Sequence, residues 1–197
     1  VLAYVVLLIS LLLFHALFTY SIFLKFIGGL SPITFFRKIK NVALFAFSTS
    51  SSAATIPVTL KTVNQDLGVN QNVASFVVPV GATINMDGTA IMQGLATVFI
   101  AQMSGIDLTL FQYGQVVLLA VATSIGTAAV PSAGTITLII ILQQFNLPLE
   151  AIGIILAVDR VLDMIRTSVN VTGDAAIACI VAKSENQLDE SIFNAHK

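Results

Sequence analysis

The sequence predicts an all-α membrane protein with two re-entrant helical hairpins and discontinuous transmembrane helices, arranged as an inverted repeat. Three observations predict this fold class: the composition, five long apolar blocks, and a motif that occurs twice. Of 197 residues, 56% are apolar and only 10% are charged. A soluble globular domain carries about 25% charged residues. The net charge of −1 gives no reason to expect a nucleic acid as partner.

The first block, residues 1–30, is predicted to be a transmembrane helix. It is predominantly apolar from its first residue to Ile27, and ~20 such residues cross the hydrocarbon core. The stretch exceeds the ~7–15 apolar residues of a signal peptide and has no basic segment before it. Because no initiator methionine precedes it, we expect a longer protein whose N-terminal part is missing here. We expect His15 to pack within the helix rather than to bind a ligand.

Basic residues on both sides of the second block indicate that this block enters the membrane and returns. These residues are Lys25, Arg37, Lys38, Lys40 and Lys61. A single crossing would leave one basic flank outside, against the positive-inside rule. The fourth block is flanked by Asp107 and Glu150 with no basic residue near, as expected for a segment that enters from outside.

A repeated motif supports the two hairpins. TSSSAATIP (49–57) and TSIGTAAVP (123–131) share their first two residues, an alanine and a β-branched residue before proline. In both cases a polar residue of the next span follows the proline by 28 positions, at Asn85 and at Asp159. Opposite entry sides would make this an inverted repeat. The alternative is that SSSAAT is only a serine-rich linker.

The chain therefore divides into a first helix and a core of residues 31–197. The predicted parts of the core are a re-entrant hairpin at 33–66, an interrupted span at 69–105, a second re-entrant hairpin at 108–148, a span with a polar stripe at 150–183, and a cytoplasmic tail at 184–197.

The third block carries one charged residue, Asp87. Three glycines that weaken a helix, Gly81, Gly88 and Gly94, lie in the same block. Irregular backbone at membrane depth is tolerated only where it is buried in protein or lines a wet cavity. We therefore interpret Asp87 as a cation ligand, with Asn85 beside it. The alternative is a hydrogen-bonded structural aspartate.

The last block carries the strongest signal. Its polar residues are Asp159, Asp163, Arg166, Asn170 and Asp174. Steps of three and four place them on one helical face, with Thr167 close by. Each charge at mid-bilayer costs ~2.5–3.5 kcal/mol, so they must face one another, an ion or a substrate. An aspartate and an arginine one turn apart suit a zwitterion with an acidic side chain. The alternative is a purely structural Asp163–Arg166 pair.

No phosphate-binding loop, zinc spacing or nucleophile–base set occurs in the sequence, so we do not expect an enzyme. SSSAATIPVT, GATINMDGTA, SIGTAAVPSAG and LDMIRTSVNVTGDA together resemble the glutamate transporter family of dicarboxylate/amino acid:cation symporters. The resemblance covers nearly the whole chain, as the C-terminal part of the family's transport domain. It implies the sixth span, hairpin one, the seventh span, hairpin two and the eighth span. It also implies a homotrimer, formed through a scaffold absent from this chain.

The resemblance implies roles for individual residues. For the substrate they are Ser52 and Asn170 at the α-carboxylate; Asp163, Thr167 and the carbonyls of Ser50 and Val130 at the amino group; and Arg166, Thr89 and the backbone near Gly134 at the side-chain carboxylate. For co-transported sodium they are Gly81, Asn85, Asn170 and Asp174 in one site; Thr83, Ser124, Ile125 and Thr127 in a second; and Asn85 and Asp87 in a third, shared with a span absent from this chain.

The expected function is sodium-coupled symport of aspartate or glutamate by an elevator mechanism, in a bacterial inner membrane. The family's additional arginine is absent, because Ser50 and Met164 occupy the two positions where members carry it. Asp174 favours sodium over protons. Alternatives are a proton- or sodium-coupled carrier of dicarboxylates or neutral amino acids, an ion channel on the same fold, and a structural membrane subunit.

Overall fold

The computed structural model describes residues 1–195, and this part of the chain consists of helices joined by loops, without a β-strand. The α-helices are α1 (Leu2–Phe14), α2 (Tyr20–Ile22), α3 (Pro32–Thr49), α4 (Ser52–Gln65), α5 (Gln71–Ile84), α6 (Asp87–Met103), α7 (Leu110–Ile125), α8 (Ala133–Gln144), α9 (Ile152–Ser184) and α10 (Glu190–Asn194). The predicted all-α architecture is confirmed. The last two residues of the predicted tail lie outside the described residues.

One helix is long and apolar enough to cross a membrane by length and composition among the described residues. It runs from Leu2 to Ile27. A π-helical stretch, His15–Thr19, joins α1 to α2, and a second, Phe23–Ile27, follows α2. The helices α7 and α8 are apolar but shorter.

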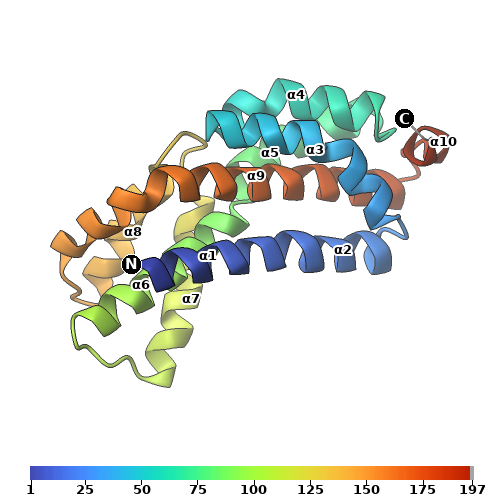
Figure 1. Ribbon diagram of the computed structural model, residues 1–197. Helices are drawn as coiled ribbons and strands as arrows, with labels where there is room; N and C mark the ends of the chain where they lie inside the picture. The colour runs from blue at the N-terminus through green and yellow to red at the C-terminus, as the bar shows by residue number, and fades with distance from the viewer. Residues whose placement is uncertain (196–197) are drawn as a thin grey trace.

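The helix α9 is the axis of the molecule. It runs through the middle of the structure, with α3 and α4 on one side and the first helix on the other (Figure 1). Its N-terminal half belongs to an apolar core shared with α1, α6 and α8. Its C-terminal half belongs to a second core shared with α3, α4 and α5. A polar segment of α9 therefore lies where the two cores meet.

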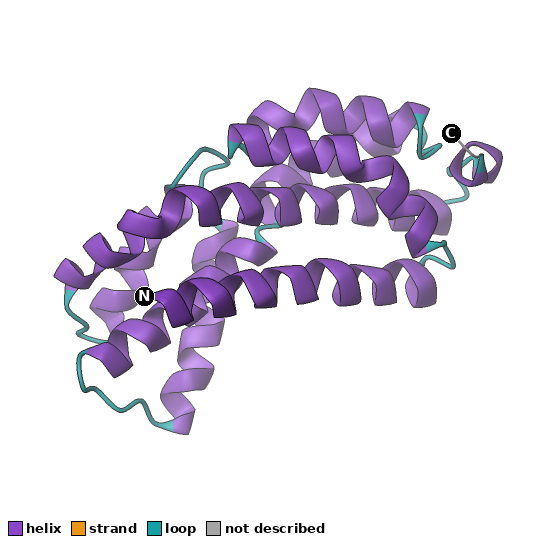
Figure 2. Cartoon of the chain, viewed as in Figure 1, coloured by secondary structure: helices purple, strands orange, loops and turns teal. Residues whose placement is uncertain are grey.

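Three breaks in the helices come together beside α9 (Figure 2). Between α3 and α4 the break is only Ser50 and Ser51, with Ser50 in the left-handed region at φ 50°. Between α7 and α8 it is a seven-residue loop, 126–132. In each case the second helix packs back against the first.

The third break lies between α5 and α6, at Asn85 and Met86. The sequence suggested that glycines weaken this segment, but Gly81, Gly88 and Gly94 all lie inside helices. α5 ends at Asn85, where the backbone leaves the helical region at ψ 77°. The side-chain amide of Asn85 bonds to α9. Gly81 and Gly88 serve a different purpose, since both are points of close approach to α9.

The end of the chain folds back onto the turn between α4 and α5. Val69 and Leu188 form an antiparallel bridge, and Phe193 of α10 is fully buried in the second core. Residues 184–195 are therefore part of the fold.

Candidate functional site

The polar stripe of α9 is buried. Asp159, Asp163, Arg166, Asn170 and Asp174 have exposed fractions of only 2–4%. Removing these side chains from water costs free energy, so they require hydrogen-bonding or charged partners within the protein.

The three breaks and α9 enclose one polar cavity. It is lined by Ser50, Ser52, Met86, Thr89, Thr127, Ala128, Ala129, Val130, Gly134, Asp163, Arg166, Thr167 and Asn170. All nine residues that the sequence analysis assigned to the substrate lie in this lining. Residues more than 100 positions apart along the chain thus share one wall.

Arg166 is the centre of the cavity's charge. Its Nη2 donates to Asp163 Oδ1 at 2.5 Å and its Nη1 donates to Asp159 Oδ1 at 3.3 Å. The other oxygen of Asp163 accepts the N–H of Ser132, from the loop between α7 and α8, at 2.9 Å. Two aspartates share the one arginine, so a carboxylate ligand at Arg166 would compete with them for the guanidinium.

The cavity is closed around this arrangement. Its volume is about 20 Å³, and a buried water needs ~10–15 Å³ on the same measure. An amino acid is larger than this, so it enters only when a wall of the cavity moves. The loop 126–132 is one of these walls, and the Ser132–Asp163 hydrogen bond holds it to α9.

Asn170 links α9 to the start of α6. Its Oδ1 accepts the N–H of Gly88 at 2.7 Å, and its Nδ2 lies 3.5 Å from Thr89 Oγ1. A Cβ at Gly88 would lie 2.9 Å from Arg166 Cγ and 3.0 Å from Asn170 Oδ1. Only glycine permits this approach, which holds the cavity wall together.

A second polar cluster lies one turn further along α9. Asn85 Nδ2 donates to Asp174 Oδ1 at 2.8 Å and to the carbonyl of Asn170 at 3.2 Å. Gly81 approaches the same carboxylate, because a Cβ there would lie 2.6 Å from Asp174 Oδ1. The structure thus brings together the four residues assigned to the first sodium site.

Asp87 lies apart from this cluster. Its Oδ2 is 3.0 Å from His15 Nε2 and accepts the Tyr20 hydroxyl at 3.2 Å. Tyr20 also donates to the carbonyl of Val169. The sequence suggested a packing role for His15 and no role for Tyr20. Both residues pair with a position more than 60 residues away, and no local pattern indicates such a contact.

The residues assigned to the remaining sodium site are only partly together. Ser124, Ile125 and Thr127 share the end of α7, where Thr127 N–H donates to the Ser124 carbonyl at 3.1 Å. Thr83 lies on the last turn of α5 and is exposed, and its hydroxyl bonds to Val80 of its own helix. Within residues 1–195, no hydrogen bond joins Thr83 to the other three.

A sodium site here would combine single acidic side chains with other oxygen ligands. No group of three or more His, Cys, Asp or Glu side chains in the described part of the chain could hold a metal ion. Hard cations such as Na⁺ are also held by backbone carbonyls at unwound helices, which the Asn85 break offers.

Sequence reasoning missed Gln93, a fully buried amide on α6. Its Nε2 donates to the Gly134 carbonyl at 3.0 Å and to Thr137 at 2.7 Å, and its Oε1 accepts the Thr123 hydroxyl at 2.8 Å. It therefore ties α6 to both α7 and α8. An amide inside an apolar helix was the available signal.

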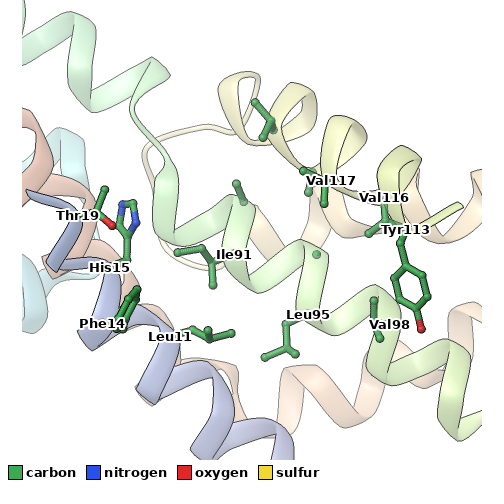
Figure 3. A pocket seen from close by; sticks show the side chains of 14 residues that line it. Leu11, Phe14, His15, Thr19, Ile91, Leu95, Val98, Tyr113, Val116 and Val117 are labelled. Carbon is green, nitrogen blue, oxygen red and sulfur yellow. The ribbon is translucent and has the colours of Figure 1, made fainter. Parts of the chain in front are cut away.

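A larger groove of about 540 Å³ lies between α1, α6 and α7 (Figure 3). Its lining is hydrocarbon except for His15, Thr19 and Tyr113. The groove lacks the charges that recognise a polar solute, so the small cavity at Arg166 is the candidate site.

An apolar helical chain that buries charges around a cavity where three helix breaks meet has the design of a membrane transport protein. Comparison with known proteins makes the class specific. The chain belongs to the sodium:dicarboxylate symporter family, whose model matches residues 1–184.

Its relatives include animal proteins. The chain is 44% identical over 171 residues to excitatory amino acid transporter 5 of Homo sapiens. The match covers 87% of the chain and 30% of that protein. The chain is 45% identical over 170 residues to human excitatory amino acid transporter 2, covering 85% and 30%. It is 43% identical over 178 residues to an excitatory amino acid transporter of Caenorhabditis elegans, covering 90% and 35%. The chain spans about a third of the length of these relatives.

Proposed function

We propose that the full-length protein is a secondary active symporter that moves an acidic amino acid, aspartate or glutamate, together with sodium ions. The observation that carries this proposal is Arg166, which lies 2% exposed between two aspartates in the wall of the polar cavity. A guanidinium held in this way recognises a carboxylate through paired hydrogen bonds. The names of the family and of the relatives agree with this substrate class.

The cavity residues divide into three groups in this proposal. Arg166 and Thr89, with the backbone near Gly134, take the side-chain carboxylate. Asp163 and Thr167 take the ammonium, with the carbonyls of Ser50 and Val130, and Ser52 and Asn170 take the α-carboxylate. When the substrate binds, Asp163 therefore gives up its ion pair with Arg166 and pairs with the substrate ammonium. This exchange leaves Asp163 and Arg166 each with a charged partner in both states.

Sodium ions would be bound beside the substrate as co-transported cargo. Gly81, Asn85, Asn170 and Asp174 form the best supported site, because hydrogen bonds and close packing already join them. The second proposed site uses Thr83 with Ser124, Ile125 and Thr127. The third uses Asn85 and Asp87.

The proposal includes an arrangement in the membrane. The pairs α3–α4 and α7–α8 would be re-entrant hairpins from opposite sides, related as an inverted repeat, and the domain would move as an elevator within a homotrimer. Two helices that pack back on each other around a short break support the hairpins. The relatives described above are animal proteins, so the bacterial inner membrane stays a prediction from sequence.

Replacing Arg166 in the full-length protein tests the function. Charge-assisted hydrogen bonds contribute ~1.5–3 kcal/mol, so Arg166→Ala should weaken aspartate binding by about 10- to 150-fold. Serine binding should be weakened less. Arg160→Ala is the matched control, because Arg160 is an exposed arginine on the same helix. Equilibrium binding and sodium-driven uptake of aspartate, succinate and serine are measured.

Arg166→Lys serves as a second variant if Arg166→Ala does not fold, because it keeps the charge and loses the planar pair of donors. Unchanged aspartate affinity in a folded Arg166 variant would remove the proposed role. Succinate competing as well as aspartate would instead favour a dicarboxylate carrier.

A further inference from the structure

The two loops that cover the cavity meet at a single backbone carbonyl. Ala129, in the loop between α7 and α8, accepts the hydroxyl of Ser51 at 2.8 Å and the N–H of Ala53 at 3.3 Å. Ser51 lies in the break between α3 and α4 and is 8% exposed. Its neighbours Ser50 and Ser52 line the cavity, as does Ala129. The contact therefore closes the cavity by joining the α3–α4 break to the loop 126–132.

The Ser51 hydroxyl makes two hydrogen bonds, one as donor and one as acceptor. It donates its proton to Ala129, and it accepts the N–H of Ala54 at 3.2 Å as the N-cap of α4. A hydroxyl offers both a donor and an acceptor, whereas a carboxylate offers only acceptors. The two roles can therefore be separated by substitution: glycine is a tolerable N-cap but has no donor.

The closed loop has a second attachment, the Ser132–Asp163 hydrogen bond. In the proposed function a substrate ammonium replaces this bond, because it takes Asp163. The bond between Ser51 and Ala129 involves no group assigned to the substrate. It can persist with the cavity filled and must break for the loop to leave.

We propose that Ser51 is a positioning residue that latches the loop 126–132 to the α3–α4 break and so sets how often the cavity opens. This inference rests on the proposed function for its purpose, but the latch itself is a property of the two loops. A hydrogen bond of this kind contributes ~0.5–1.5 kcal/mol. Its loss raises the ratio of open to closed loops about 2- to 10-fold.

Distances between spin labels test the latch directly. Labels are placed at Ser48→Cys on α3 and at Gly126→Cys in the loop, both of which are exposed and outside the cavity lining. Cys179 is fully buried and does not compete for the label. The distance distribution is measured by pulsed electron paramagnetic resonance, on the full-length protein in liposomes without amino-acid substrate.

Three variants are compared with the unsubstituted latch. Ser51→Gly loses the donor but keeps a tolerable cap, and Ser51→Thr keeps both roles. Thr59→Val is the control, because the buried Thr59 hydroxyl bonds only within α4, to Thr55 at 3.1 Å. Ser51→Ala replaces Ser51→Gly if the glycine variant does not fold.

The latch predicts that Ser51→Gly increases the longer-distance population about 2- to 10-fold relative to the shorter one, while Ser51→Thr and Thr59→Val match the parent. An unchanged distribution in Ser51→Gly, or an equal increase in Thr59→Val, overturns it. The result is independent of the substrate: if the distances shift but the protein binds no acidic amino acid, the latch stands and the proposed function fails.

Discussion

Replacing Gly81 with alanine tests the sodium site at the point where α5 comes closest to α9. A Cβ at position 81 would lie 2.6 Å from Asp174 Oδ1 and 2.9 Å from its Cγ. The carboxylate cannot simply rotate away, because Oδ1 already accepts Asn85 Nδ2 at 2.8 Å. The substitution therefore displaces the one ionisable group in the proposed site.

The size of the effect follows from this overlap. Inserting a methyl group into a packed site costs ~1–3 kcal/mol. If the displaced Asp174 carboxylate no longer reaches the cation, this free-energy cost destabilises the sodium-bound form. Sodium affinity then drops about 5- to 150-fold.

The assay is a sodium titration of aspartate binding by the full-length protein, with thermal unfolding measured on the same samples. Gly153→Ala is the matched control, because nothing lies within 4 Å of a Cβ at that position and it also exchanges a helical glycine for alanine. An unchanged sodium midpoint in folded Gly81→Ala would refute the role of Asp174. An equal shift in Gly153→Ala would show that the effect is not local.

Two further predictions concern the tail and the membrane arrangement. The Ser191 hydroxyl and the backbone N–H of Ile192 hydrogen-bond to the Asp189 carboxylate and hold its pKa below the usual value. A lowered folded-state pKa means that this cap is fully present above the unfolded value of about 3.9 and is lost as pH falls through the lower one. Protection of the Ile192 amide against hydrogen exchange, relative to its intrinsic rate at each pH, should therefore fall only in acid. Asp189→Asn, which keeps an acceptor, should abolish that dependence, and a loss of protection between pH 5 and 7 would contradict it. Cysteines are introduced one at a time at Thr109 and Asn146, the two ends of the α7–α8 pair. Both should react with an impermeant maleimide from the same side of the membrane. Labelling from opposite sides would show that the α7–α8 pair crosses the membrane.

The helical architecture and the stripe of α9 could be predicted because both depend on local patterns. Apolar blocks of sufficient length predict helices, and steps of three and four place Asp163 and Arg166 on one face whatever surrounds them. The repeated TSSSAATIP and TSIGTAAVP motifs indicated where the other two walls of the cavity lie. The individual substrate roles came from the family resemblance.

Other features depend on contacts between distant segments and could not be predicted. The break at Asn85 is accompanied by a hydrogen bond to Asp174, which lies 89 residues away. The pairing of Asp87 with His15 and Tyr20 depends on how the first helix packs against α6. The small volume of the cavity depends on how side chains from several helices pack together, and helical periodicity does not specify that packing.

The central claim is that an acidic amino acid binds between the two helix breaks and the charged face of α9. A cryo-EM map of the full-length protein with aspartate and sodium chloride tests it most directly. The account predicts density for aspartate between the α3–α4 break and the loop 126–132, with its side-chain carboxylate on Arg166 and its ammonium on Asp163. Aspartate bound elsewhere, or Arg166 still paired with Asp163 in the occupied protein, would contradict it.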